Sequence, residues 1–254
     1  MSTSKKIVIC GVGIAGIATA YYLIREDNNL DITIIDKNQP LAYTSSKSGE
    51  NFRDYWPHKS MEALSSHSIE LMKDLKTIYG EDAFKMEFSG YHFVSHDAKK
   101  AIFADDSSPE FKQRNKVETN PVTIHQNHPY LDKNIQKSIF IQKAGNVDSI
   151  TMANLMLQAA KSKGVKLVEG EIIDLKKAGD SYTIHLTNET SINADQLIIA
   201  AGPFINHLGN KLGLNFPVWN TLQRKFIIPD PKGIIPTDMP FTIYADGQTL
   251  DWPE

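Results

Sequence analysis

The chain has 254 residues, a formal net charge of −3 and ordinary shares of hydrophobic (41%) and charged (22%) residues. These values are typical of a globular protein, and the length suits one α/β domain with an inserted or appended lobe. No run of lysine or arginine longer than a pair marks a nucleic-acid or membrane surface, so a small molecule is the expected partner. The single cysteine, Cys10, has no partner for an internal disulfide, which predicts a cytoplasmic protein.

The start of the chain predicts a βαβ unit. A buried strand over 6–10 is followed by a glycine-rich loop, a helix over 15–25 and a second strand over 32–36. The stretch 7–24 carries no charge and superficially resembles a membrane anchor. Its glycines divide it into a short strand and a helix, which favours a packed βα unit over a spanning helix.

Helical or alternating spacing of apolar residues predicts most of the later elements. In chain order they are a helix over 60–79, a strand over 90–94, polar surface elements of a substrate lobe over 97–134, a helix over 149–163, strands over 165–175, 182–186 and 196–200, and an antiparallel extension from Pro217 to the end. The polar stretch includes His125 and His128, which we interpret as solvated loop histidines because no third metal ligand accompanies them.

The loop Gly11-Val12-Gly13-Ile14-Ala15-Gly16 predicts a dinucleotide site. Glycines in this pattern let the backbone turn tightly and approach a pyrophosphate, while the helix N-terminus supplies free N–H groups. Asp36 ends the second predicted strand, where a carboxylate accepts hydrogen bonds from ribose hydroxyls. The strand, loop, helix, strand and acid in register make this signal stronger than the glycines alone.

A second motif narrows the class of dinucleotide. Leu197-Ile198-Ile199-Ala200-Ala201-Gly202-Pro203 is an apolar strand that ends in small residues and a turn. Alone it is typical of any buried strand that precedes a loop. Paired with the N-terminal glycine loop, it resembles flavoproteins with two dinucleotide-binding folds, in which this strand end returns to the cofactor. The resemblance implies FAD.

Further ordered motifs resemble the D-amino-acid oxidase superfamily, which includes sarcosine and glycine oxidases. They are Ala144-Gly145-Asn146-Val147-Asp148-Ser149, Gly164-Val165, Ala194-Asp195-Gln196, Ala200 to Phe204, Leu212-Gly213-Leu214, Pro217-Val218 and Gln223. This resemblance implies an α/β fold: a Rossmann-like FAD-binding domain (1–84 and 140–208) with an interleaved, partial α+β substrate domain (85–139 and 209–254). Members run on well beyond this length, so we expect a C-terminally truncated chain or a partner chain that completes the site.

The same resemblance implies the site residues. Those expected to bind the cofactor are Gly11, Val12, Gly13, Ile14, Ala15, Gly16, Asp36, Lys37, Ser45, Ser46, Ile172, Ala200, Ala201 and Gly202. Arg53 is the candidate for the carboxylate of a substrate, ahead of Lys47 and Arg224, and a surface arginine in a long loop is the alternative interpretation. No catalytic residue and no metal ligand is assigned.

The implied activity is oxidation of the C–H bond next to the amine of an amino acid or N-methyl amino acid, with hydride transfer to the flavin. Two alternatives stay open at this point. One is a hydroxy-acid or polyol dehydrogenase on the same scaffold, and the other is a non-catalytic FAD-binding fragment or assembly protein. The expected partner is a small-molecule amine or amino acid, with no nucleic acid and no membrane.

Overall fold

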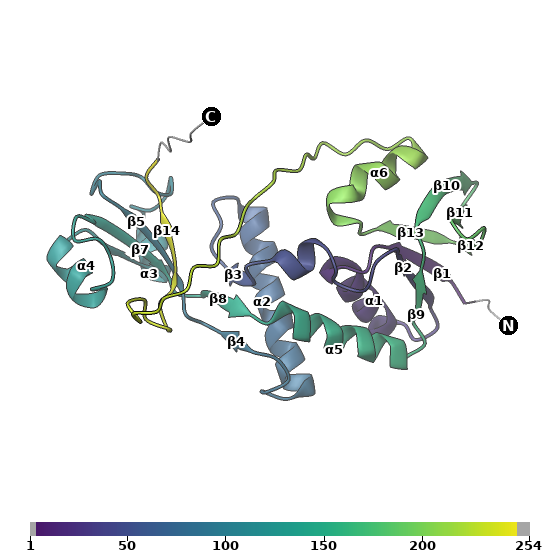
Figure 1. Cartoon of the computed structure of the whole chain (residues 1–254), viewed down its shortest axis with the longest axis horizontal. Helices are drawn as coiled ribbons and strands as arrows, with labels where there is room; N and C mark the ends of the chain where they lie inside the picture. Colours follow the sequence, from purple (N-terminus) through teal and green to yellow (C-terminus); the bar gives the residue numbers. More distant parts are fainter. Residues whose placement is uncertain (1–3, 248–254) are drawn as a thin grey trace. The chain divides into compact units, whose positions relative to one another are not determined.

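The computed structural model describes residues 4–247, and the chain forms two compact units (Figure 1). Unit 1 comprises the chain up to residue 49 and residues 149–225. Unit 2 comprises residues 50–148 and the chain from residue 226 onward. The predicted domain boundaries differ from these, because 50–84 and 140–148 belong to unit 2 and 209–225 to unit 1. The assignment of one domain to FAD and one to substrate stays a prediction.

Unit 1 is built on a parallel sheet with the strand order β13-β1-β2-β9, and helix α1 packs on helix α5 beside it. Its elements are β1 (Lys6–Cys10), α1 (Ile14–Glu26), β2 (Asp31–Asp36), the 3₁₀ turn η1 (Thr44–Lys47), α5 (Ser149–Ser162), β9 (Lys166–Glu169), β10 (Ile172–Ala178), β11 (Ser181–Leu186), β12 (Ser191–Ala194), β13 (Gln196–Ile199), η2 (Gly202–Phe204), α6 (Ile205–Gly209) and η3 (Asn210–Leu212). Residues 7–10 of β1 are all buried, as expected for a central parallel strand covered on both faces.

The prediction of one strand over 165–175 is wrong, because the chain forms two strands that belong to different sheets. β9 extends the parallel sheet, and β10 pairs antiparallel with β11, which pairs with β12 in a separate three-stranded sheet. The division falls at Gly170, whose N–H donates to the Asp36 carbonyl at 2.9 Å. Residues 165–175 carry apolar side chains on both sides of Gly170, so their spacing alone does not show that the chain changes sheet there, and β12 was not predicted.

Unit 2 contains two sheets, with the strand orders β14-β5-β7-β6 and β3-β8-β4. Its elements are β3 (Asn51–Arg53), α2 (Lys59–Tyr79), β4 (Met86–Glu87), β5 (Tyr91–Ser95), α3 (Pro109–Arg114), β6 (Asn115–Glu118), α4 (Pro121–Asn127), β7 (Lys137–Ile141), β8 (Ala144–Val147) and β14 (Phe241–Tyr244). Aromatic rings, among them Tyr55, Phe103 and Phe111, form much of its core. The stretch 97–134, predicted as polar surface elements, contains the short helices α3 and α4 and the strand β6.

The predicted antiparallel extension after Pro217 is also wrong within the described residues. No strand is described between 217 and 240, and β14 pairs parallel with β5. Asp246, just after β14, accepts hydrogen bonds from Ser95 Oγ at 2.6 Å and from the His96 N–H at 2.8 Å. These bonds join the residue shortly after β14 to the end of β5. The rest of the predicted extension, 248–254, lies outside the described residues.

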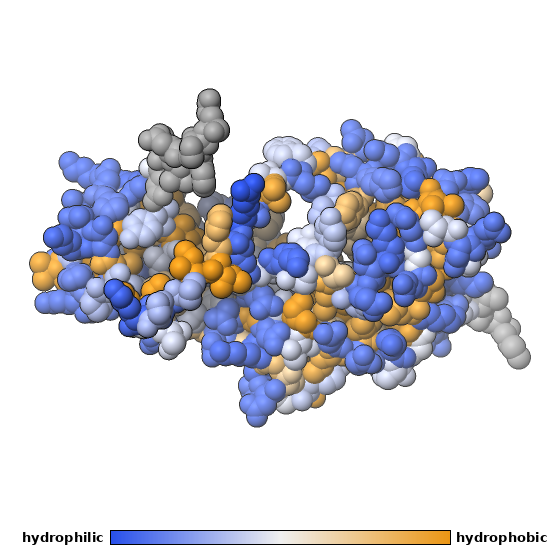
Figure 2. All heavy atoms as spheres, in the orientation of Figure 1, coloured by the Kyte–Doolittle hydropathy of each residue, from blue (hydrophilic) through white to orange (hydrophobic). Residues whose placement is uncertain are grey.

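Hydrophilic side chains cover much of the surface in view in Figure 2, and the apolar cores lie inside the units. Within residues 4–247, no helix is both long enough and apolar enough to cross a bilayer. The uncharged stretch 7–24 forms β1 and the first part of α1, as its glycines predicted.

Candidate functional site

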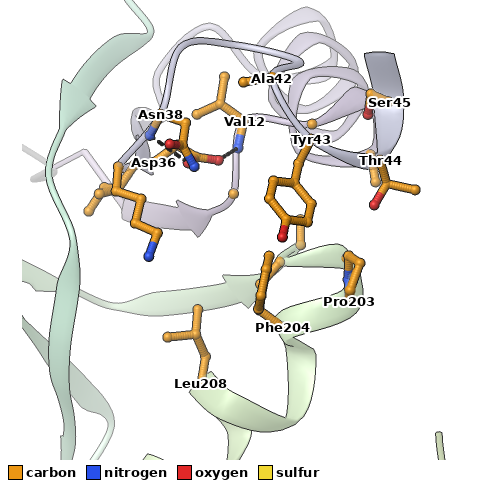
Figure 3. A pocket seen from close by; sticks show the side chains of 18 of the residues that line it. Val12, Asp36, Asn38, Ala42, Tyr43, Thr44, Ser45, Pro203, Phe204 and Leu208 are labelled. Atoms are coloured by element: carbon orange, nitrogen blue, oxygen red, sulfur yellow. Dashed lines mark hydrogen bonds between the residues drawn. The ribbon is translucent and has the colours of Figure 1, made fainter. Parts of the chain in front are cut away.

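Unit 1 contains a cavity of about 690 Å³ at the carboxyl ends of β1, β2 and β13 (Figure 3). This edge of an open parallel sheet is where ligands bind in α/β folds, because the strands there give way to loops and helix N-termini. The cavity is lined by the glycine loop, by the segment after β2 and by the segment after β13.

The glycine loop has the close backbone approach that its sequence predicted. Gly11 adopts φ +113°, and a Cβ added there would lie 2.4 Å from the Ala200 carbonyl oxygen. A Cβ added at Gly16 would lie 2.0 Å from the Gly11 carbonyl oxygen. Both positions exclude any larger residue, so the ends of β1 and β13 and the start of α1 come together without side chains between them. Backbone therefore forms the floor of the cavity.

Asp36 fixes the loop and still has capacity to accept hydrogen bonds. One carboxylate oxygen accepts from the Val12 N–H at 2.9 Å, and the other accepts from the Asn38 N–H at 3.0 Å. An ionised carboxylate offers about four acceptor positions, so about two remain for hydroxyl groups of a ligand. Figure 3 shows Asp36 on the wall of the cavity beside Val12. This arrangement suits ribose recognition and also explains why an acid is needed at this position.

The start of α1 offers donors for an anion. The first N–H groups of a helix have no acceptor within it, and they carry the positive end of the helix dipole. Ser45 Oγ accepts from the Ile14 N–H at 3.0 Å. Among the described residues, none accepts from the N–H of Gly13 or Ala15, and both residues line the cavity. A pyrophosphate fits these donors.

Small residues and a charged pair complete the lining of the cavity. Ala200, Ala201 and Gly202 follow β13 and lie on the wall. Lys37 and Glu171 also line the cavity and form an ion pair at 2.8 Å. The hydrogen bond that Lys37 donates to Glu171 raises the pKa of Lys37, and the same contact lowers the pKa of Glu171. The lysine charge is therefore already balanced within the protein.

The structure brings together nearly all the residues predicted to bind the cofactor. Gly16 and Ser46 are the exceptions, since neither lines the cavity. Gly16 packs behind the Gly11 carbonyl, and the Ser46 hydroxyl donates to the carbonyl oxygens of Ala42 and Tyr43. The sequence did not predict several lining residues, among them Leu41, Ala42, Tyr43, Glu171, Pro203, Phe204 and Leu208. Most of them lie next to predicted positions, so extending each motif by a few residues would have found them.

Comparison with known proteins decides the family. The model of the family "FAD dependent oxidoreductase" matches residues 6–244. The chain belongs to this family. FAD is the cofactor of these oxidoreductases, and the glycine loop, Asp36 and the free N–H groups fit its ADP half. The chain is 23% identical to the Bacillus subtilis glycine oxidase and to the Synechocystis bifunctional protein ThiO/ThiG, over 85% and 99% of this chain.

Solved structures show the same fold. The chain superposes on L-proline dehydrogenase from P. horikoshii with a TM-score of 0.74 and 19% identity, over 96% of this chain and 65% of that one. For glycine oxidase from Geobacillus kaustophilus the TM-score is 0.70, with 20% identity over 85% of this chain and 60% of that one. The chain spans 58% of the B. subtilis glycine oxidase and 40% of the ThiO/ThiG protein. The predicted α/β flavoprotein fold is confirmed.

Arg53, the predicted substrate residue, lies in unit 2 at the end of β3. Its guanidinium carbon is 4.1 Å from the ring centre of Trp56, 5.3 Å from that of Phe93 and 5.6 Å from that of Tyr91. Its Nε is buried and has no hydrogen-bond partner among residues 4–247, and no described carboxylate forms an ion pair with it. Burial lowers the pKa of Arg53. Arg53 thus lies in a strand and is partly buried rather than exposed in a long loop, and its role toward a substrate stays a prediction.

Cys10 and the histidines of unit 2 lie outside the cavity and are buried to different degrees. Cys10 is fully buried at the end of β1, and burial raises the pKa of its thiol to about 12, which leaves it a packing role. His128, predicted as a solvated loop residue, is half-buried and packs on the buried ring of His92 at 4.4 Å, while His125 is exposed. Within residues 4–247, no group of three or more potential ligands is placed to hold a metal ion.

Proposed function

We propose that this chain binds FAD in the unit 1 cavity and takes part in oxidising the C–H bond next to the nitrogen of an amino acid or N-methyl amino acid. The observation that carries the proposal is the convergence of the glycine loop, Asp36 and unpaired helix N–H groups on one cavity. The substrate class is supported by relatives named glycine oxidase and dimethylglycine dehydrogenase. Unit 1 is then the FAD-binding domain.

In this proposal, different residues of the cavity bind different parts of the cofactor. Gly13 and Ala15 offer their N–H groups to the pyrophosphate, and Asp36 accepts from the ribose of the adenosine. Val12, Ile14, Lys37, Ser45, Ile172, Ala200, Ala201 and Gly202 complete the wall, with Gly16 and Ser46 holding the loops behind it. When bound, FAD supplies the acceptor for hydride.

Arg53 is the proposed site for the carboxylate of the substrate. A guanidinium enclosed by aromatic rings is partly desolvated, so a carboxylate that reaches it forms a stronger hydrogen-bonded pair than it would in water. The orphaned Nε–H is a donor that such a pair would satisfy. Unit 2 is then the substrate domain.

The test begins with the visible absorption of the purified chain after incubation with FAD and gel filtration. Retained flavin, lost in Gly11→Ala, supports the cofactor site, and a folded protein without flavin refutes it. Glycine, sarcosine and proline are then added without oxygen, with lactate and glycerol as the matched compounds that lack an amine. Loss of the flavin absorption with an amine, but not with lactate or glycerol, supports the proposed substrate class. Bleaching by lactate or glycerol would instead favour hydroxy-acid or polyol chemistry.

A further inference from the structure

Two exposed aromatic side chains meet across the unit 1 cavity. The rings of Tyr43 and Phe204 have their centres 5.0 Å apart, at 63° in an edge-to-face arrangement. Both residues line the cavity, and Figure 3 shows the two rings pointing toward one another from opposite walls. Aromatic pairs of this geometry attract one another beyond the burial of their area.

The sheet order places this contact over the end of β1. Tyr43 belongs to the segment after β2, and Phe204 to the segment after β13, and these two strands flank β1. The glycine loop leaves the sheet between them, at the end of β1. A dinucleotide whose phosphates lie on this loop is therefore enclosed where the two rings touch, and it leaves most easily when they part.

The aromatic contact is not what holds either segment in place. The side chains are 58% and 43% exposed, so neither ring belongs to the core. The Tyr43 segment is held by backbone and serine hydrogen bonds, including the Leu41 N–H to the Val12 carbonyl at 3.0 Å and the Ser46 hydroxyl to the Tyr43 carbonyl at 2.9 Å. Aromatic side chains that line a cavity are typical of ligand contacts.

We infer that Tyr43 and Phe204 form a clasp that retains FAD by closing the cavity over the glycine loop. The inference rests on the proposed binding of FAD in this cavity, and it assigns retention of the cofactor to two residues outside the glycine and Asp36 motif. The clasp slows dissociation because both rings must separate before the dinucleotide leaves. Removing either ring opens the clasp, so the two residues act as one unit.

The test measures FAD dissociation from the wild-type chain, Tyr43→Ala, Phe204→Ala and the double variant, by the recovery of free-flavin fluorescence after dilution. Each single variant is expected to release FAD about three- to tenfold faster than wild type. The double variant is expected to release it about as fast as either single variant, because the second substitution removes a ring that has already lost its partner. Tyr43→Phe keeps the ring and is expected to keep the wild-type rate.

The matched control is Phe88→Ala, which breaks another exposed edge-to-face pair, Phe52–Phe88, with centres 5.2 Å apart in unit 2. It is expected to leave the rate unchanged. Thermal unfolding without FAD checks that every variant is folded. The clasp would be overturned if Tyr43→Ala and Phe204→Ala released FAD at the wild-type rate. It would also be overturned if the double variant multiplied the rate increases of the two single variants. Either result would leave FAD binding itself intact. A folded wild-type chain that binds no FAD would overturn the proposed function itself, and the clasp with it.

Discussion

His92 is expected to make the stability of unit 2 depend on pH. Its side chain is 0% exposed on β5, with Nε2 2.5 Å from Ser138 Oγ and with no hydrogen-bond partner for Nδ1 among residues 4–247. The His128 ring lies 4.4 Å away and the Phe140 ring 6.0 Å away, so no carboxylate in this contact shell stabilises a charged imidazole. Burial, and secondarily the charge of His128, lower the pKa of His92 to about 4.

The sign and size of the effect follow from this shift. The unfolded chain binds the proton below a pH of about 6.5, whereas the folded chain resists it until about pH 4. Stability is therefore complete above about pH 6.5 and is lost as the pH falls toward 4. A fall of the pKa from 6.5 to about 4 corresponds to about 3 kcal/mol of unfolding free energy.

The measurement compares wild type with His92→Gln, which keeps a polar group near Ser138 but does not titrate. Amide hydrogen exchange of β5 and β7, at about pH 7 and about pH 4.5, reports the stability of unit 2 alone. Wild type is expected to lose about 2 to 3 kcal/mol more than the variant on acidification. His125→Gln, at an exposed position of α4, is the control and should behave as wild type. An equal loss in wild type and His92→Gln would refute the assignment of the effect to His92.

Three further changes test other parts of the chain. Gly11→Ala forces a Cβ against the Ala200 carbonyl at φ +113° and is expected to cost about 2–4 kcal/mol in chemical unfolding and to abolish retention of FAD in gel filtration. Arg53→Ala is expected to raise the KM of an amino-acid substrate about tenfold to a hundredfold, with a smaller rise for the matched amine that lacks a carboxylate. Lys137→Ala leaves the buried carboxylate of Asp106, now 2.8 Å from the ammonium, without its charged partner, and is expected to cost about 3–5 kcal/mol in urea unfolding.

The parts of the fold that the sequence predicted are those set by local rules. β1, α1 and β2 lie within a residue or two of their predicted bounds, because a buried apolar strand, a glycine loop and an amphipathic helix follow one another without a long-range contact deciding their type. The candidate site was predictable for the same reason. Its floor is backbone, so glycine and alanine at fixed spacing carry the signal.

Unit 2 was harder to predict because its elements depend on partners distant in sequence. β3 and β4 are short strands that exist through pairing with β8, far along the chain. β14 pairs parallel with β5, and Asp246 after it contacts Ser95 and His96, which are distant in the sequence. None of these contacts has a local signature, and residue spacing alone does not distinguish a parallel from an antiparallel neighbour.

The same contrast separates the proposed ADP site from Arg53, the proposed site for the substrate carboxylate. The proposed ADP site is made largely by the backbone of one βαβ unit, so glycines and one acid at fixed spacing mark it in the sequence. Arg53 depends instead on rings from two segments of unit 2, Trp56 shortly after β3 and Tyr91 and Phe93 on β5. A side-chain site of this kind can change its ligand by replacing one ring, whereas the glycine loop tolerates no Cβ. The cofactor class is therefore the more direct inference from the sequence, whereas the proposed substrate class rests on side-chain contacts such as those of Arg53.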